Sequence, residues 1–264
     1  MVDVYAVGAA TVRALTDARG EFFLPAREAF PDAPETAWRG ARELDPAAFA
    51  GEQWRLPFRC FLVAAGSTTI LVDAGIGPVA APAASWAPVP GVLPEELAAA
   101  GVAPGDIDIV VLTHIHTDHI GWAVDYGTRR PYFPNARYLL HQADLDGAPP
   151  ERLAQLLDPL RAAGQLQLVD GSLSLAAGVR VQHAPGHTPG HQVVLVEAAG
   201  ETMAISGDAF VHAIQVADPS VAYAIEDDPA TAHASRLALL RQADVLATAH
   251  LTEPFHRLGE MAAR

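Results

Sequence analysis

The chain has 264 residues, of which 50% are hydrophobic and 18% are charged, so it is long enough to bury a sizeable core. Its 31 acidic and 17 basic side chains give a formal charge of −14, which repels polyanions and argues against nucleic acid as a partner. A single cysteine, Cys60, excludes an internal disulfide and any metal site built from several thiolates. A metal would therefore depend on imidazole and carboxylate ligands.

The N-terminus carries Asp3 and no basic cluster before an apolar run, and no uninterrupted apolar stretch reaches 18 residues. We therefore expect a cytoplasmic protein with no membrane partner. No short repeat or linker interrupts the chain, so we expect one domain over residues 1–264. Residues 14–57 and 76–93 are rich in Pro, Ala and aromatic residues without a clear period, and we expect them to be irregular loops that form a substrate pocket. The same aromatic side chains could equally pin these loops to the core.

Eight short runs rich in apolar and β-branched residues have the length of strands and end at Gly, Asp or His. In chain order they are residues 58–65, 68–75, 106–114, 136–142, 178–184, 191–198, 202–209 and 243–250. Three helical patterns lie between them, at residues 94–102, 150–164 and 228–243. Asp228 is a suitable N-cap for the last helix, with Pro229 at its first position. This alternation predicts an α/β sandwich in layers, with Cys60 buried in the first strand.

The segment THIHTDHIGW, residues 113–122, places three of the 11 histidines and an aspartate within six positions. His114 and His116 leave the end of a buried strand on the same side, because alternate residues of a strand point the same way. Asp118 and His119 follow in a tighter turn and face the same volume. Buried imidazoles without partners cost free energy, and a divalent metal removes that cost. We therefore predict a metal site, with a hydrogen-bonded surface cluster of histidines as the alternative.

Three later strand ends supply further side chains of the kinds that bind metals. They are His183, His187 and His191 in HAPGHTPGH, Asp208 in ISGDAF and His250 in ATAHLTEPF. Each lies where α/β sheets usually build their sites, at the end of a strand. We therefore expect these segments to complete the predicted metal site.

Together these motifs resemble the metallo-β-lactamase superfamily of hydrolases, whose His-x-His-x-Asp-His signature matches residues 114–119. The resemblance extends over roughly residues 58–256. It is carried further by LVDAGIG (71–77), PGHTPGH (185–191), SGDAF (206–210) and TAHLTEP (248–254). It implies an αββα four-layer sandwich with a dinuclear metal site, commonly zinc, at the edge of two facing sheets.

By motif matching, the resemblance implies two zinc ions per chain, with manganese or iron as alternatives. The first ion would be held by His114, His116 and His187, the second by Asp118, His119 and His250, and Asp208 would bridge them. Asp118 and Asp208 would be the catalytic carboxylates, Asp118 by moving a proton to the leaving group. Asp73 and His191 would orient ligands from behind, although Asp73 could equally cap a turn.

The resemblance implies hydrolysis by a hydroxide that bridges the two metals, and the chain has no Gly-x-Ser-x-Gly motif for a serine nucleophile. The β-lactamases of the superfamily lack an aspartate at the position of Asp208, and the acidic charge of this chain disfavours a nuclease. FPNA and the His212-x-x-Gln215 pattern most resemble the branch of methyl parathion hydrolase and the acyl-homoserine lactonases. Familiar lactonases have a tyrosine where this chain has Val211; His212 could replace it or simply hold a loop.

Trp122 directly follows the metal motif, so we expect it to line an apolar pocket, together with Phe210 and His212. Such a pocket favours an uncharged ester, lactone or aryl phosphotriester as a small-molecule substrate. A glyoxalase II-like thioester hydrolase is the alternative, and it would need Arg129 and Arg130 for the glutathione carboxylates. A mononuclear iron persulfide dioxygenase is a further alternative. The sequence is also compatible with a homodimer.

Overall fold

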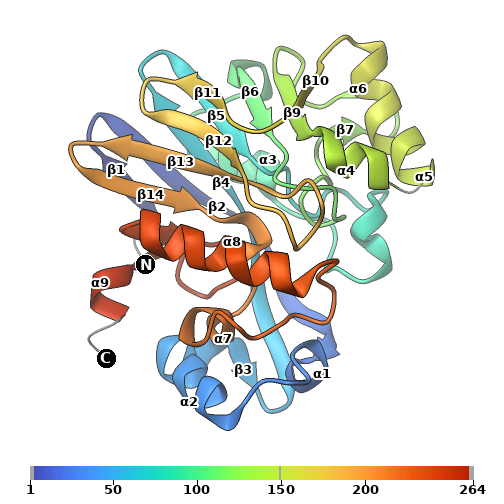
Figure 1. Ribbon diagram of the computed structural model, residues 1–264. Helices are drawn as coiled ribbons and strands as arrows, with labels where there is room; N and C mark the ends of the chain where they lie inside the picture. Colours follow the sequence, from blue (N-terminus) through green and yellow to red (C-terminus); the bar gives the residue numbers. More distant parts are fainter. Residues whose placement is uncertain (1–2, 149, 262–264) are drawn as a thin grey trace.

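The computed structural model describes residues 3–148 and 150–261 (Figure 1). Its first β-sheet has the strand order β1-β2-β4-β5-β6-β9-β10, and β3 pairs with β4. The strands are β1 (Val4–Val7), β2 (Ala10–Pro25), β3 (Phe49–Ala50), β4 (Gln53–Ala65), β5 (Thr68–Val72), β6 (Ile109–Val111), β9 (Arg137–His141) and β10 (Leu166–Val169). The sheet is antiparallel from β1 to β5 and parallel from β5 to β10.

The second sheet has the order β11-β12-β13-β14-β15-β16 and is antiparallel except for the parallel pair β14 and β15. Its strands are β11 (Leu173–Ala176), β12 (Val179–His183), β13 (Gln192–Ala198), β14 (Glu201–Ile205), β15 (Val245–Ala247) and β16 (Phe255–Arg257). A short ribbon pairs β7 (Val124–Asp125) with β8 (Arg130–Pro131).

Helices lie between the strands and cover the sheets. The α-helices are α1 (Ala26–Ala29), α2 (Glu35–Leu44), α3 (Leu93–Ala99), α4 (Gln142–Gly147), α5 (Pro150–Arg152), α6 (Asp158–Ala162), α7 (Ala213–Ala217), α8 (Pro229–Gln242) and α9 (Leu258–Met261). Short 3-10 turns cover Pro46–Ala48, Pro82–Ser85, Pro104–Asp106 and Gly207–Ala209, and a π-helical turn covers Leu153–Leu157. Within the described residues, no helix is long and apolar enough to cross a membrane.

The two sheets pack face to face through an apolar layer. Val63 and Val111 of the first sheet belong to the same buried cluster as Val194 and Met203 of the second. The outer face of the first sheet packs on α3 and α6, and the outer face of the second packs on α8 (Figure 1). The expected αββα four-layer sandwich is therefore confirmed, and most strands are apolar on both faces because both faces are covered.

All eight expected strands and all three expected helices are present, with ends that differ by a few residues. Asp228 caps α8 through a hydrogen bond from the Thr231 amide to its side chain, at 3.0 Å, and Pro229 occupies the first turn. Cys60 is buried in β4, as expected. The motifs are therefore attached to the elements from which they were predicted to emerge.

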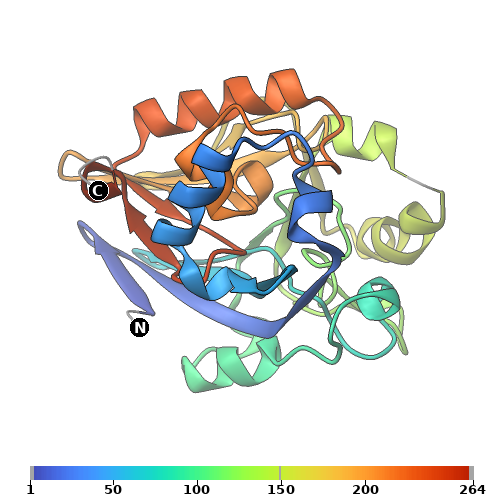
Figure 2. The same ribbon diagram turned by 90° about the horizontal axis from the view of Figure 1, so that it is seen from below.

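The expectation of an irregular loop over residues 14–57 was wrong. Most of this segment is regular, because it contains the long strand β2 and the helices α1 and α2. Asp17 and Gly20 lie inside β2, and both residue types disfavour strands. The sequence pattern therefore did not indicate a strand here. Helix α2 lies beside α7 at one end of the sandwich, and α1 lies at the same end, which is seen from below in Figure 2.

Candidate metal centre

Seven side chains expected to bind metal lie together at the carboxyl ends of strands from both sheets. They follow β6 in the first sheet and β12, β14 and β15 in the second. Because β14 and β15 run parallel, their carboxyl ends meet, which brings Asp208 next to His250. The seven residues are His114, His116, Asp118, His119, His187, Asp208 and His250.

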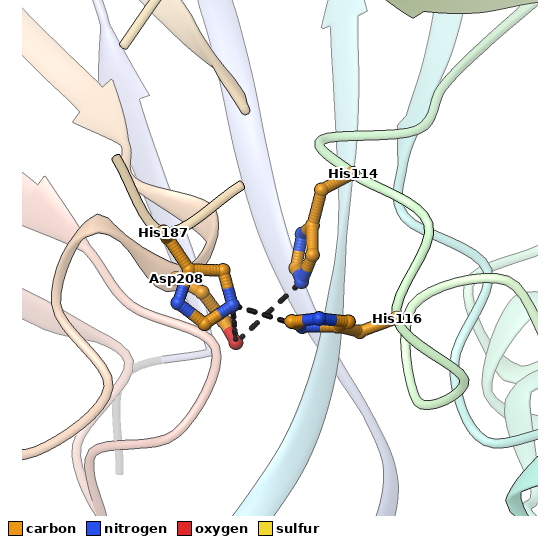
Figure 3. Close-up of side chains that lie close together, drawn as sticks. All are labelled: His114, His116, His187 and Asp208. Atoms are coloured by element: carbon orange, nitrogen blue, oxygen red, sulfur yellow. Dashed lines mark hydrogen bonds and ion pairs between the residues drawn. The ribbon is translucent and has the colours of Figure 1, made fainter. Parts of the chain in front are cut away.

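Four of these side chains form the first group, with ligand atoms within 4.8 Å of one another. His187 Nε2 lies 2.9 Å from His116 Nδ1 and 3.2 Å from Asp208 Oδ2. His114 Nε2 lies 3.7 Å from the same carboxylate oxygen. Figure 3 shows His114 and His116 entering from one side and His187 and Asp208 from the other. Three imidazole nitrogens and one carboxylate oxygen thus converge on one point.

The second group consists of Asp118, His119 and His250. His119 Nε2 and His250 Nε2 each lie 3.5 Å from Asp118 Oδ2. They also lie 3.1 and 3.2 Å from Asp208 Oδ1, the oxygen opposite the one that faces the first group. The Asp208 carboxylate therefore lies between the two groups and can contribute one oxygen to each.

Hydrogen bonds on the far side of three rings fix which nitrogen faces the centre. His119 Nδ1 is 2.8 Å from Asp73 Oδ2, and His250 Nδ1 is 2.9 Å from the Pro57 carbonyl oxygen, so both Nδ1 atoms donate. The Thr113 hydroxyl donates to Asp73, so His114 Nδ1 must donate to Thr113 Oγ1. A neutral imidazole has one N–H, so each of these rings turns a bare Nε2 lone pair toward the centre.

These contacts fit a metal cation. His119 Nε2 and His250 Nε2 lie only 3.4 Å apart although neither carries a proton in its neutral form. His114 Nε2 and Asp208 Oδ1 are buried and have no hydrogen-bond partner among the residues that the structure describes. Facing lone pairs and unpaired buried acceptors cost free energy unless a cation lies among them. The donor set of imidazole nitrogens and carboxylate oxygens is the one that Zn²⁺ accepts.

The electrostatic environment shifts the pKa values of the side chains in the centre in different directions. Burial and the neighbouring imidazoles hold the pKa of His114 and of His116 well below the ordinary value, so both rings are neutral. Burial raises the pKa of Asp208, but the surrounding imidazoles, His119 foremost, outweigh burial and hold that pKa well below its usual range. Burial lowers the pKa of His119 and of His250, but the Asp208 and Asp118 carboxylates outweigh burial and raise both values. These two rings must therefore release a proton when a metal binds, because metal ligands are neutral imidazoles and ionised carboxylates.

Asp73 and His191 support the centre from behind. Asp73 is buried with a positive φ of 64°, and its carboxylate accepts hydrogen bonds from the Thr113 amide, the Thr113 hydroxyl and His119 Nδ1. His191 Nε2 accepts a hydrogen bond from the Asp208 amide at 3.0 Å, and its Nδ1 donates to the Ala184 carbonyl. Each residue thus fixes the position of a group in the centre without facing it.

A pocket with an empty volume of about 580 Å³, partly open to solvent, lies beside the centre. Five side chains of the centre line it, namely His116, Asp118, His187, Asp208 and His250. Five aromatic side chains also line it, namely Phe22, Phe23, Trp54, Trp86 and Tyr223. Among the described residues that line the pocket, Arg152 is the only Lys or Arg. Both segments expected to form walls contribute, because Phe22, Phe23 and Trp54 lie in 14–57 and Trp86 in 76–93.

Trp122, Phe210 and His212 were expected to line the pocket, and the structure places all three elsewhere. Trp122 donates its indole N–H to Asp17 and packs against Tyr132. Phe210 is fully buried under α8. His212 is enclosed by aromatic rings, and its Nδ1 caps α7 by accepting the Ile214 amide proton. A position next to a motif in sequence does not fix where a side chain points.

Tyr223, which sequence reasoning missed, lies in the pocket beside the centre. Its ring stacks on the His187 imidazole with centroids 6.0 Å apart and planes 6° apart. Burial, followed by the carboxylates of Asp208 and Asp118, raises the pKa of its hydroxyl, which therefore stays protonated. No motif surrounds Tyr223, so only the fold could reveal its place.

A buried polar network holds the segment that carries Tyr223. Glu226 accepts hydrogen bonds from the Tyr223 amide, from Gln215 Nε2 at 3.0 Å and from the Arg236 guanidinium. Arg236 is fully buried in α8 and also donates to the carbonyls of Pro219 and Val221. The pattern His212-x-x-Gln215, noted in the sequence, therefore supports the pocket through Gln215.

Comparisons with known proteins agree with this geometry. The curated relatives include the mouse protein named metallo-beta-lactamase domain-containing protein 1, which is 34% identical over 188 residues, 70% of this chain and 64% of the relative. An N-acyl homoserine lactonase from a Bacillus species is 27% identical over 162 residues, 56% of this chain and 61% of the relative. The matched regions thus span somewhat less than two thirds of each of these two relatives.

Among solved structures, a dizinc quorum-quenching lactonase named AidC, in complex with a product, has the same fold. Its TM-score is 0.76 at 24% identity, covering 96% of this chain and 92% of that one. The family model described as the metallo-beta-lactamase superfamily matches residues 57–250, which contain all seven side chains of the centre. The chain therefore belongs to the metallo-beta-lactamase superfamily.

Proposed function

We propose that this protein is a dinuclear zinc-dependent hydrolase of an uncharged ester, lactone or aryl phosphotriester. The observation that carries the proposal is the position of Asp208, whose two carboxylate oxygens face two separate groups of ligands beside an aromatic pocket. His114, His116 and His187 would hold one zinc ion, and Asp118, His119 and His250 the other. Bound zinc supplies an activated water and polarises the bond that is cleaved.

The protein's own residues would orient the substrate and move protons. Asp118 lines the pocket with its carboxylate beside His119 and His250, so it can take a proton from the attacking water and pass it to the leaving group. Tyr223 presents a protonated hydroxyl to the same space and can donate a hydrogen bond to the carbonyl or phosphoryl oxygen. A phenol from this segment would fill the role left open by Val211.

The pocket wall supports an uncharged substrate with an apolar or aromatic portion. Phe22, Phe23, Trp54 and Trp86 form a connected set of rings, with centroid separations between 4.3 and 5.7 Å. Flat apolar walls of this kind hold aryl and acyl groups by burying their surface. The similarity to N-acyl homoserine lactonases supports the lactone member of the proposed class.

One observation favours the first of two alternative functions, and another disfavours the second. Arg152 lies in the pocket and could hold a carboxylate, which is the one observation that favours a glyoxalase II-like thioester hydrolase. Arg129 and Arg130, the cations expected for that role, do not line the pocket. The second group of ligands is complete, which favours a dinuclear hydrolase over a mononuclear iron dioxygenase.

The test measures proton release by zinc-loaded protein and by chelator-stripped protein. The substrates are a long-chain acyl-homoserine lactone, an aryl ester, an aryl phosphotriester and a glutathione thioester. We expect metal-dependent turnover of the lactone or of one of the two aryl compounds. Turnover of the thioester alone would replace the proposal with the glyoxalase-like activity. Silence on all four would overturn both, and iron content with oxygen consumption would then test the dioxygenase.

A further inference from the structure

A buried carboxylate outside the metal centre holds the pocket wall in place. Asp17 lies in β2, is fully buried, and contacts none of the seven side chains of the centre by hydrogen bond or ion pair among the contacts described. Its Oδ2 accepts the Ile76 amide proton at 2.6 Å, and its Oδ1 accepts the Leu93 amide proton at 2.6 Å. These two amides stand at the two ends of one segment, residues 76–93.

The same carboxylate also receives a side chain that follows the metal motif. Trp122 Nε1 donates to Asp17 Oδ1 at 3.1 Å, and the Asp17 carbonyl accepts the Val92 amide proton at 2.8 Å. Three parts of the chain therefore meet at one residue, namely β2, the segment 76–93 and the end of the metal motif. A buried carboxylate without such donors would be strongly unfavourable, so the donors and Asp17 depend on each other.

Two glycines make room for this carboxylate. A Cβ atom on Gly75 would lie 2.2 Å from Asp17 Oδ2, and a Cβ atom on Gly91 would lie 2.2 Å from Oδ1. Gly75 also has a positive φ of 59°, which favours glycine. The backbone approaches Asp17 this closely only because both residues lack a side chain.

The segment between the two anchored ends carries part of the substrate pocket. Trp86 lies in it, lines the pocket, and packs against Phe22 and Phe23 with centroids 5.7 and 5.5 Å away. The Trp86 indole N–H donates to Thr117 Oγ1 at 2.9 Å, and Thr117 stands between the ligands His116 and Asp118. The wall and the metal motif are thus joined at Trp86 and again at Asp17.

We propose that Asp17 is a positioning residue for substrate selection: by binding both ends of the segment 76–93 and the Trp122 indole, it fixes the Trp86 wall relative to the metal centre. This inference rests on the proposed function, because it assigns the wall to the substrate of that site. Under this proposal Trp122 also affects substrate selection. It does so indirectly, through its hydrogen bond to Asp17, and not by lining the pocket as its position after the metal motif suggested.

The test compares Asp17→Asn with a control, Asp244→Asn, at an exposed aspartate. Asn keeps the size of Asp17 but places an NH₂ group against one of the amide donors, so at least one anchor is lost. Asp244 also accepts a backbone amide proton, from Thr202 at 2.8 Å, but lies outside the pocket. Trp122→Phe removes the indole N–H and part of the ring volume but keeps an aromatic ring against Tyr132, and it carries the test if Asp17→Asn does not fold.

Three measurements are made on each protein: amide hydrogen exchange over residues 76–93, zinc content, and kinetics with phenyl acetate and with a bulkier naphthyl ester. In Asp17→Asn we expect exchange at Ile76 or at Leu93, whichever amide faces the new NH₂ group, to accelerate by about tenfold or more, because a hydrogen bond to a charged acceptor is lost. KM for the naphthyl ester should rise by about tenfold while kcat for phenyl acetate stays within about threefold. Trp122→Phe should shift the same quantities in the same direction by less, and Asp244→Asn should match the wild type.

Unchanged exchange over 76–93 and an unchanged KM for the naphthyl ester would overturn the inference. An equal loss with both esters, together with loss of zinc, would also overturn it, because Asp17 would then act on the centre and not on the wall. Exchange and zinc content need no turnover. A wild-type protein that hydrolyses nothing would therefore count against the proposed function, while exchange would still decide whether Asp17 anchors the wall.

Discussion

The Tyr223 ring lies parallel to the His187 imidazole, with centroids 6.0 Å apart, at the edge of the metal centre. Tyr223 comes from the segment between α7 and α8, whereas His187 follows β12. This stack fixes the plane of the phenol, and burial with nearby carboxylates keeps the hydroxyl protonated by raising its pKa. A donor placed in this way can stabilise charge on the oxygen of the bond under attack.

Tyr223→Phe should therefore lower kcat/KM with little loss of zinc. Phe keeps the stack on His187 and removes only the hydroxyl. Loss of one donor to a developing oxyanion typically reduces the rate by about 100-fold, and we expect a reduction of about tenfold to 100-fold here. Tyr132→Phe, on a tyrosine outside the pocket, is the control. Wild-type kinetics in Tyr223→Phe would remove the hydroxyl from the mechanism.

Asp208→Asn should reduce hydrolysis by about 100-fold or more and lower the zinc content below two ions per chain. The carboxylate offers one oxygen to each group, and an amide replaces one of these anionic oxygens with an NH₂ group. Zinc is measured by elemental analysis after dialysis, with Asp227→Asn as a nearby exposed control. Two retained zinc ions with near-wild-type turnover would contradict a bridging role for Asp208.

The grouping of seven His and Asp side chains was predictable from sequence because most of its information is local, and the family resemblance selected His187 among the three histidines of its segment. His114, His116, Asp118 and His119 stand within six positions, and each remaining ligand follows an apolar run that reads as a strand. Strand ends from neighbouring strands meet at one edge, so the motifs could be brought together without knowing the packing. The layered fold was predictable for the same reason, since eight strands and three helices have clear periodicity.

The two segments that contribute to the pocket wall were expected from the sequence, but several side chains of the pocket were not predictable, because their positions depend on contacts between distant segments. Trp122 and His212 lie within a few residues of His119 and Asp208 in sequence. Backbone pairing of Trp122 with Ala74 nevertheless turns the indole toward Asp17, and His212 turns inward to cap α7. Tyr223 is placed by Glu226, whose partner Arg236 is 10 residues further along the chain. Such side-chain directions follow from tertiary packing, which carries no periodic signal in the sequence.

His191→Phe should weaken zinc binding more than it slows the zinc-saturated enzyme. His191 accepts the Asp208 amide proton and donates to the Ala184 carbonyl, and Phe of similar size removes both bonds. Loss of a partner behind a ligand typically costs about 10- to 100-fold in metal affinity. Zinc affinity is measured by competition with a chelator, and kcat is then measured in excess zinc. An unchanged affinity would show that His191 does not position Asp208.

His212 should make the folded state less stable as the pH falls. Burial, with a smaller contribution from Arg42, lowers the pKa of His212 to about 3, below its ordinary value of 6.5. Its aromatic surroundings offer no partner for a second proton, and Nε2 has no hydrogen-bond partner within the described residues. The unfolded chain, in contrast, takes up a proton near pH 6.5. Below that pH protonation favours the unfolded state, by about 1.4 kcal/mol per pH unit until the folded pKa is reached.

His212→Asn tests this dependence, because Asn can still accept the Ile214 amide proton as an N-cap but does not titrate. Chemical denaturation at pH 8 and at pH 5, under the same metal conditions, gives the free energy of unfolding of both proteins. The variant should be less stable at pH 8, since a smaller side chain leaves space among the rings. Its loss between pH 8 and pH 5 should be smaller than that of the wild type by about 2 kcal/mol, because pH 5 lies 1.5 units below the ordinary value of 6.5. Equal losses would mean that His212 gains its proton in the folded state as readily as in the unfolded chain, and the enclosed neutral ring would then be excluded.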